Sequence, residues 1–152
     1  MSFDPTRSTA AGYWHFAAQY FHAAQAVASS PENLMFPALQ LYGQSIELGL
    51  KAFLLERGAT LGEVNKLRHD LAEILQVARK RRLGTEVRFS ANDVALINLL
   101  SEQYKFHRFR YIVTGAARIP TAECIAPVCQ RLLVGLEQYC TGSAWGLRRQ
   151  NG

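Results

Sequence analysis

Apolar residues recur along most of the chain at steps of three and four positions, and the alternation typical of strands is almost absent. The first such pattern runs from about Ser8 or Thr9 to Ser29 and carries two adjoining apolar faces with aromatic residues on both. This periodicity predicts an amphipathic helix. Because two apolar faces need more than one neighbour, we expect the helix to pack inside a bundle or across a dimer.

The second pattern is apolar on nearly all sides, which predicts the central helix of the domain. It begins near Asn33, after a Ser-Pro break, and ends at Gly58, a residue type favoured just after the end of a helix. Gly43 and Gly49 lie within it, and their lack of a side chain would let another helix approach closely.

Three further helices are expected in the rest of the chain. A loop over residues 59–68 leads to a helix that starts at a capping box, 70–73, and ends in four basic residues closed by Gly84. A similar box at 90–93 starts the next helix. Residues 112–119 are expected to be extended and to lead into the last helix.

Together these patterns predict an all-α fold, an antiparallel up-and-down bundle of four to five helices. The length of 152 residues suits one domain. We expect a single domain over residues 1–152, with its core over about 9–140 and a loosely ordered tail over 141–152.

The composition agrees with a folded domain, since 49% of the residues are apolar and 19% are charged. No apolar run approaches the ~20 residues that a membrane span needs, and the first residues show no signal peptide. Cys124, Cys129 and Cys140 form neither a disulfide framework nor a metal motif, so we expect small buried residues of one helix. A cytoplasmic protein without membrane contact is the resulting expectation.

The chain carries 17 basic and 12 acidic residues, which gives a formal net charge of +5. This excess favours an acidic partner, although a solvated basic face is the simpler interpretation. The densest run of positive charge lies at the expected end of the third helix and comprises Arg79, Lys80, Arg81 and Arg82.

Several familiar sites are absent from the sequence. It contains no glycine-rich phosphate loop, no His-Glu-x-x-His, no Glu-x-x-His and no Gly-x-Ser-x-Gly. His15 and His22 are too widely spaced on one helix to share a metal ion and are best explained as surface residues. The sequence therefore predicts no metal site and no cofactor.

Three groups of residues remain as candidates, and the first is a polar line on the central helix. Gln40, Gln44, Glu47 and Lys51 lie within roughly 60° of arc on that helix. Glu47 and Lys51 have the spacing of an ordinary helix-stabilising ion pair. The alternative is a ligand-binding line that faces a cleft or a partner.

The second candidate is His69, which precedes Asp70 at a predicted helix start. The positive end of the helix dipole favours a neutral imidazole there, and a neutral imidazole can act as a base. A histidine in this position can equally cap the helix or pack against the loop.

The third candidate is the segment His107, Arg108, Phe109, Arg110 and Tyr111. Guanidinium groups interleaved with aromatic rings suit phosphate contact and base stacking. Alternatively, the Arg110 side chain folds back and forms an internal ion pair with Glu47.

The order of these pieces resembles the HEPN domain, the higher eukaryotes and prokaryotes nucleotide-binding family. The resemblance spans about residues 10 to 140 and rests on four short motifs: the helix segment SIELGLKAFLL from Ser45 to Leu55, Gly58, His69-Asp70-Leu71 and Arg110-Tyr111. It implies an all-α bundle, frequent homodimers, and roles in bacterial defence, toxin–antitoxin pairs or RNA processing. Active members of the family are metal-independent ribonucleases with an Arg, four to six intervening residues and then a His, and no such pair occurs in this sequence.

Three hypotheses about function follow, and the first is preferred. It is a non-catalytic dimeric module that binds RNA, a nucleotide or a cognate protein partner, with Glu47, Lys51, Arg108, Arg110, Tyr111 and the run 79–82 as candidate binding residues. The second is a metal-independent ribonuclease with a rearranged site, in which His69 or His107 serves as base and acid and Arg110 stabilises the charged phosphorane. The third is a purely structural or regulatory subunit.

Overall fold

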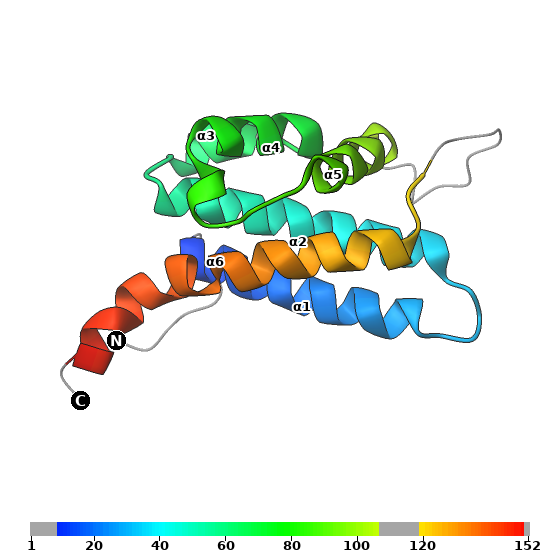
Figure 1. The fold of residues 1–152 in the computed structure, drawn as a ribbon, viewed down its shortest axis with the longest axis horizontal. Coiled ribbons are helices and arrows are strands. Elements are labelled where there is room, and N and C mark those ends of the chain that lie inside the picture. The colour runs from blue at the N-terminus through cyan, green and yellow to red at the C-terminus, as the bar shows by residue number, and fades with distance from the viewer. Residues whose placement is uncertain (1–8, 107–118, 151–152) are drawn as a thin grey trace.

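The computed structural model describes the backbone of residues 9–106 and 119–150, and the side chains of these ranges as far as Gly142. Within them every regular element is helical, with six α-helices, one short 3-10 turn and no strand (Figure 1). The prediction of an all-α fold is confirmed, and the structure contains more helices than the four to five expected. Most of the stretch expected to be extended, residues 112–118, lies outside the described part of the chain.

The central position of the second helix is confirmed. Helices α1 (Ala10–Ala28) and α2 (Met35–Glu56) lie side by side and run in opposite directions, and α6 (Ala122–Gln150) packs on both (Figure 1). Helices α4 (Leu71–Lys80) and α5 (Ala91–Tyr104) lie on the other side of α2. Helix α6 runs in the same direction as α2, because α4 and α5 return the chain to the end of the molecule where α2 begins.

The ends of the first two helices follow the sequence signals closely. The Thr9 hydroxyl accepts a hydrogen bond from the Gly12 N–H at 3.0 Å and caps α1. Helix α2 begins slightly later than expected, because Asn33 has a left-handed backbone with φ of 55°. Gly58, with φ of 101°, adopts the left-handed conformation that its place after α2 requires.

The expectation of a plain loop over residues 59–68 is wrong, because the segment contains a short helix, α3 (Leu61–Lys66). Thr60 and Glu63 form a complete capping box at its start, with the Thr60 hydroxyl accepting from the Glu63 N–H at 3.1 Å. Only Val64 of this helix is buried. A helix with one buried residue has no apolar stripe, so periodicity does not reveal it.

The capping box expected at 70–73 forms only in part. The Asp70 carboxylate accepts from the Glu73 N–H at 3.2 Å, as predicted. The Asp70 N–H donates to the Leu67 carbonyl at 3.3 Å instead of to the Glu73 side chain. The preceding turn thus supplies the acceptor that the box would have provided. The box at 90–93 is complete, with Ser90 and Asp93 bonded in both directions.

The expectation that Gly84 closes α4 is wrong, because the left-handed residue that follows the helix is Arg82. Arg82 is left-handed, with φ of 67° and ψ of 42°, and the 3-10 turn η1 (Leu83–Thr85) follows it directly. Gly84 lies inside η1 and has no positive φ. An arginine carries this conformation because the Arg57 side chain donates a hydrogen bond to its carbonyl at 3.1 Å.

The last helix is longer than the sequence indicates. The residues expected to point inward are buried, namely Ile125, Val128, Leu132 and Leu136, and Tyr139 is half-buried. The helical backbone continues beyond Gly142 to Gln150, where we expected a loosely ordered tail. The small, polar and basic residues of this extension offer no apolar stripe by which to recognise a helix.

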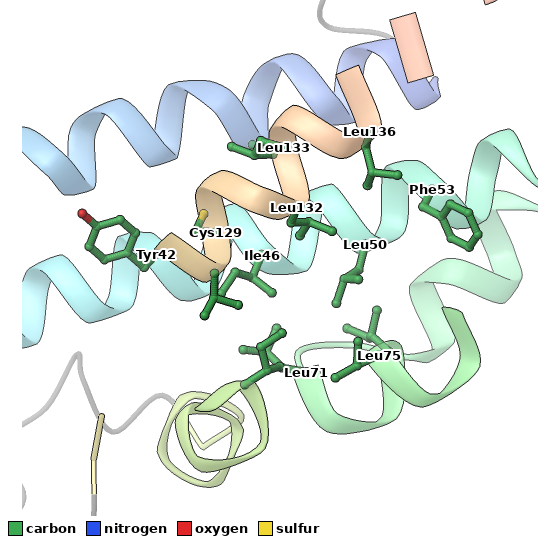
Figure 2. Packing of buried hydrophobic residues seen from close by; sticks show 14 of the residues in the cluster. Tyr42, Ile46, Leu50, Phe53, Leu71, Leu75, Cys129, Leu132, Leu133 and Leu136 are labelled. Carbon is green, nitrogen blue, oxygen red and sulfur yellow. The ribbon is translucent and has the colours of Figure 1, made fainter. Parts of the chain in front are cut away.

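The core lies where α1, α4 and α6 meet α2, as Figure 2 shows for residues such as Ile46, Leu50 and Leu132. Helix α1 has two neighbours within the chain, α2 and α6, and its Phe16 side chain remains exposed. Phe21 packs with the Tyr42 ring of α2, and the Trp14 indole donates to the Leu133 carbonyl of α6 at 3.0 Å. The bundle itself therefore provides more than one neighbour for this helix.

The cysteines fit their expected role except for Cys124, which is exposed. Cys129 and Cys140 are buried, and burial raises the pKa of each thiol to about 12. The Cys129 sulfur lies 3.1 Å from the Ser45 hydroxyl, which itself donates to the Ala17 carbonyl. These two cysteines act as small interior residues.

Two glycines of α2 allow the close contacts expected of them. A Cβ atom on Gly43 would lie 2.5 Å from a ring carbon of Tyr104, and one on Gly49 would lie 3.0 Å from Leu132. Helix α5 therefore packs a tyrosine ring directly against the backbone of α2.

No helix in the described part of the chain is long and apolar enough to cross a membrane.

Gly43→Ala is expected to lower the free energy of unfolding by up to about 2 kcal/mol, because displacing the Tyr104 ring costs about 1–3 kcal/mol. An alanine in a helix interior is otherwise favourable by roughly 1 kcal/mol, so the clash decides the sign. Denaturant unfolding measures the change. Gly84→Ala is the control, since nothing lies within 4 Å of its Cβ position. Equal stabilities of the two variants would contradict the packing described.

Candidate functional site

Glu47 is a buried carboxylate that accepts hydrogen bonds from three different parts of the chain. Lys51, one turn later on α2, donates to Oε2 at 2.8 Å. The Tyr104 hydroxyl of α5 donates to Oε1 at 2.7 Å, and the His69 Nδ1 lies 2.9 Å from the same oxygen. We call these four residues the Glu47 cluster. It joins α2, α5 and the connection between α3 and α4.

The Glu47 and Lys51 side chains are only 9% and 7% exposed, so their pair does not lie on a solvated face. The ion pair expected from their spacing is present, and it lies inside the bundle. Both polar atoms of Gln40, two turns earlier on the same line, are also buried, with no hydrogen-bond partner in the described part of the chain. The polar line of α2 is therefore turned toward the interior.

Lys51 also fixes the backbone just before α4. Its ammonium group donates to the Arg68 carbonyl at 2.6 Å. Arg68 is left-handed, with φ of 50°, a conformation that costs a non-glycine residue about 1 kcal/mol or more. The bond from Lys51 holds this turn and thereby determines where His69 lies.

His69 stands at the edge of the cluster, with 46% of its side chain exposed. An ionised carboxylate can only accept, so the His69 Nδ1 is the donor to Glu47. In a neutral ring this leaves Nε2 with the lone pair. The Tyr104 ring meets the His69 ring edge-on, with centroids 6.4 Å apart, and further restricts its orientation.

The structure assigns the helix cap to Asp70, so the alternative that His69 caps α4 is wrong. Asp70 accepts from the Glu73 N–H, and the Ser101 hydroxyl of α5 lies 3.4 Å from the same Asp70 oxygen. Ser101 also accepts from the Ala72 N–H at 3.0 Å. The first turn of α4 is thus bonded to α5 immediately beside the cluster.

Tyr13 of α1 lies close enough to Glu47 to be affected by its charge. Burial raises the pKa of the Tyr13 phenol, and the negative charge of Glu47 raises it further. The pKa shift has this sign because a second negative charge near the carboxylate is unfavourable. Tyr13 is therefore a neutral hydroxyl group on the α1 side of the carboxylate.

A groove of about 950 Å³ runs between α4 and α5. Its cations are Arg79, Lys80 and Lys105, all exposed, and its acids are Asp70 and Glu73. Because Asp70 follows His69 and Lys105 follows Tyr104 in the sequence, this α4–α5 groove adjoins the Glu47 cluster. Its remaining described lining residues are Ala72, Leu75, Gln76, Val94 and Asn98.

The structure brings together only some of the residues singled out by the sequence. Glu47, Lys51 and His69 meet in the Glu47 cluster, and Arg79 and Lys80 line the α4–α5 groove. Arg81 and Arg82 lie beyond the groove, at the end of α4. His107, Arg108, Arg110 and Tyr111 lie outside the described residues, as does any pairing of Arg110 with Glu47.

Sequence reasoning missed three contributors to the site. Tyr104 has the spacing of a core residue, and nothing along the chain connects it with Glu47, 57 positions away. Tyr13 and Lys105 were not singled out either. In the described ranges, no three His, Cys, Asp or Glu side chains lie together as a metal ion would require.

Lys51→Met is expected to lower the free energy of unfolding by about 3 kcal/mol, because it leaves the Glu47 carboxylate buried without its cation. Adding Glu47→Gln should restore at least about 1 kcal/mol, since the amide oxygen still accepts from Tyr104 and carries no charge. Lys66→Met, at an exposed position, should change the stability by at most about 0.5 kcal/mol. A loss for Lys51→Met no larger than for Lys66→Met would contradict the role of the pair.

Comparisons of the chain with protein-family models, curated proteins and solved structures find no significant match. The resemblance to HEPN domains therefore stays a prediction, and the candidate function depends on the Glu47 cluster and the α4–α5 groove.

Proposed function

We propose that the chain is a non-catalytic, HEPN-like helical module that binds RNA through the α4–α5 groove. The observation that carries this proposal is the groove itself, with Arg79, Lys80 and Lys105 exposed along it. Cations that line an open groove attract a phosphate backbone and release its counterions, which supplies sequence-independent affinity. Its volume of about 950 Å³ provides room for more than a single phosphate group.

The Glu47 cluster has a supporting role in this proposal. Two of the three donors to Glu47 also fix an element beside the groove: Lys51 holds the turn before α4, and Tyr104 is the last residue of α5. The Glu47 cluster thus holds α4 and α5, the two walls of the groove, in a fixed position relative to each other. A rigid groove binds with less loss of conformational entropy than one that must be ordered first.

The wider setting follows from the resemblance alone. We propose a homodimer in the bacterial cytoplasm that acts in defence or in a toxin–antitoxin pair. A nucleotide is the alternative small ligand, and a cognate protein is the alternative partner.

RNA affinity is expected to fall about tenfold at ~0.1 M salt in the double variant Arg79→Gln/Lys105→Gln. The slope of log affinity against log salt concentration should decrease by about 1–2, because two phosphate contacts are lost. Fluorescence anisotropy with a labelled single-stranded RNA measures both quantities. The control is Lys66→Gln/Arg88→Gln, which removes the same charge from exposed positions outside the groove. Equal affinities of the two variants would show that only net charge matters and would refute the groove.

A metal-independent ribonuclease is the second candidate, and one observation favours it. The His69 Nδ1 is held 2.9 Å from a buried carboxylate while much of the ring remains exposed, which is the arrangement of an oriented general base. In this candidate His69 removes the proton from a 2′-hydroxyl, and a 2′,3′-cyclic phosphate results. The acid and the phosphorane-stabilising group would be His107 and Arg110, outside the described residues.

Under the preferred proposal the wild-type protein binds RNA in EDTA without cleaving it. Gel analysis of end-labelled RNA after prolonged incubation tests this directly. Cleavage that is lost in His69→Ala and retained in His22→Ala, an exposed histidine of α1, would establish the ribonuclease instead. Cleavage that survives in His69→Ala would point to a contaminant or to another site and would exclude His69 as the base.

A further inference from the structure

The Arg57 guanidinium is the most heavily bonded cation in the described part of the chain. Just after α2, its Cζ lies over both the Phe53 and the Tyr139 ring, 4.9 and 5.0 Å from their centroids. Its N–H groups donate to the Tyr139 hydroxyl and to the Thr85 hydroxyl, at 3.0 and 2.8 Å. This charge is therefore fixed in place and not free to swing into solvent.

Arg57 also offsets the partial negative charge at the C-terminal end of α4. It donates to the carbonyls of Arg81 and Arg82, at 3.0 and 3.1 Å. The C-terminal end of a helix carries partial negative charge and normally repels anions. Here a fixed positive charge covers two carbonyls at that end, so the repulsion is offset.

A pocket of about 540 Å³ opens at this point, and we call it the Arg57 pocket. Its described lining consists of four basic residues and one hydroxyl residue: Arg57, Lys80, Arg81, Arg82 and Thr85. No acidic side chain of the described ranges lines it. Arg81 forms an ion pair with Glu63 at 3.4 Å, and Glu86 lies 3.4 Å from the Thr85 hydroxyl; both acids lie outside the lining. The pocket thus combines one immobilised cation with three exposed ones.

The charge of the pocket indicates which phosphate suits it. A phosphodiester carries one negative charge, whereas a phosphate monoester carries about −1.5 to −2 at pH 7 and offers three acceptor oxygens. Guanidinium groups bind such oxygens with two parallel hydrogen bonds. Four cations around one pocket therefore favour a dianionic group over a link within a strand.

We propose that the Arg57 pocket binds a phosphate monoester, the terminal phosphate of an RNA strand. Arg81 and Arg82 bind its oxygens, Lys80 adds charge, and Arg57 is a positioning residue that fixes the turn. This inference rests on the proposed RNA-binding function. Lys80 lines both the Arg57 pocket and the α4–α5 groove, so a strand whose end sits in the pocket continues into the groove.

The test compares RNA strands of one sequence that differ only at their ends: a 5′-phosphate, a 3′-phosphate, or hydroxyls at both. Wild type is expected to bind one phosphorylated strand about tenfold more tightly than the hydroxyl strand at fixed salt. Lys80→Gln/Arg82→Gln should lose this preference, and Lys66→Gln/Arg88→Gln, with the same charge change, should keep it. Arg57 is left unchanged because its substitution would also disturb the packing of Phe53 and Tyr139.

A nucleoside monophosphate and inorganic phosphate, added as competitors, separate the possible sources of the phosphate group. Competition by the monophosphate with the phosphorylated strand supports a terminal phosphate site, and equal competition by inorganic phosphate would reduce the site to a general anion pocket. If RNA binds equally well with and without a terminal phosphate, the proposal for the Arg57 pocket is refuted, whereas the proposal for the α4–α5 groove is not. If the monophosphate binds wild type but not Lys80→Gln/Arg82→Gln, and no RNA binds, the proposal of RNA binding in the α4–α5 groove is refuted. The Arg57 pocket then remains a phosphate site. Absence of both kinds of binding refutes the two proposals together.

Discussion

The arrangement of this molecule depends on the buried negative charge of Glu47. Moving a carboxylate out of water is costly unless cations and hydrogen-bond donors compensate it. Glu47 obtains that compensation from Lys51, His69 and Tyr104, which belong to α2, the α3–α4 connection and α5. The α3–α4 connection and α5 must therefore each occupy one position relative to α2. The packing of the Tyr104 ring against Gly43 adds a steric reason for the position of α5.

This constraint links the interior to the surface that we propose as functional. Lys51 holds the turn before α4, and the first turn of α4 is bonded to Ser101 of α5. At the far end of α4, Arg57 fixes the turn around Arg82. Hydrogen bonds thus hold helix α4 at both ends. The α4–α5 groove runs along its side, and the Arg57 pocket lies at its C-terminal end. A cationic surface mounted on rigid elements loses little entropy when it binds a phosphate chain.

The sequence predicted the helices where local chemistry decides them. Thr9, Ser90 and Gly58 carry signals that need no tertiary partner, and each has the role expected of it. The errors occur where distant residues intervene. The sequence predicts Gly84 as the residue that closes α4, yet the left-handed residue after the helix is Arg82, whose carbonyl accepts a hydrogen bond from Arg57. The apolar pattern does not predict helix α3, because a helix of six residues with one buried side chain has no apolar periodicity.

For the site, the sequence alone determined which side chains share a face of α2, because helical spacing places Glu47 and Lys51 one turn apart. It also determined that the end of α4 is basic. Only the tertiary structure decided that the pair is buried, that Tyr104 and His69 complete it, and that Arg57 meets the carbonyls at the end of α4. These contacts join positions 22 to 57 residues apart, and their formation depends on how helices pack, a property that no local spacing in the chain encodes.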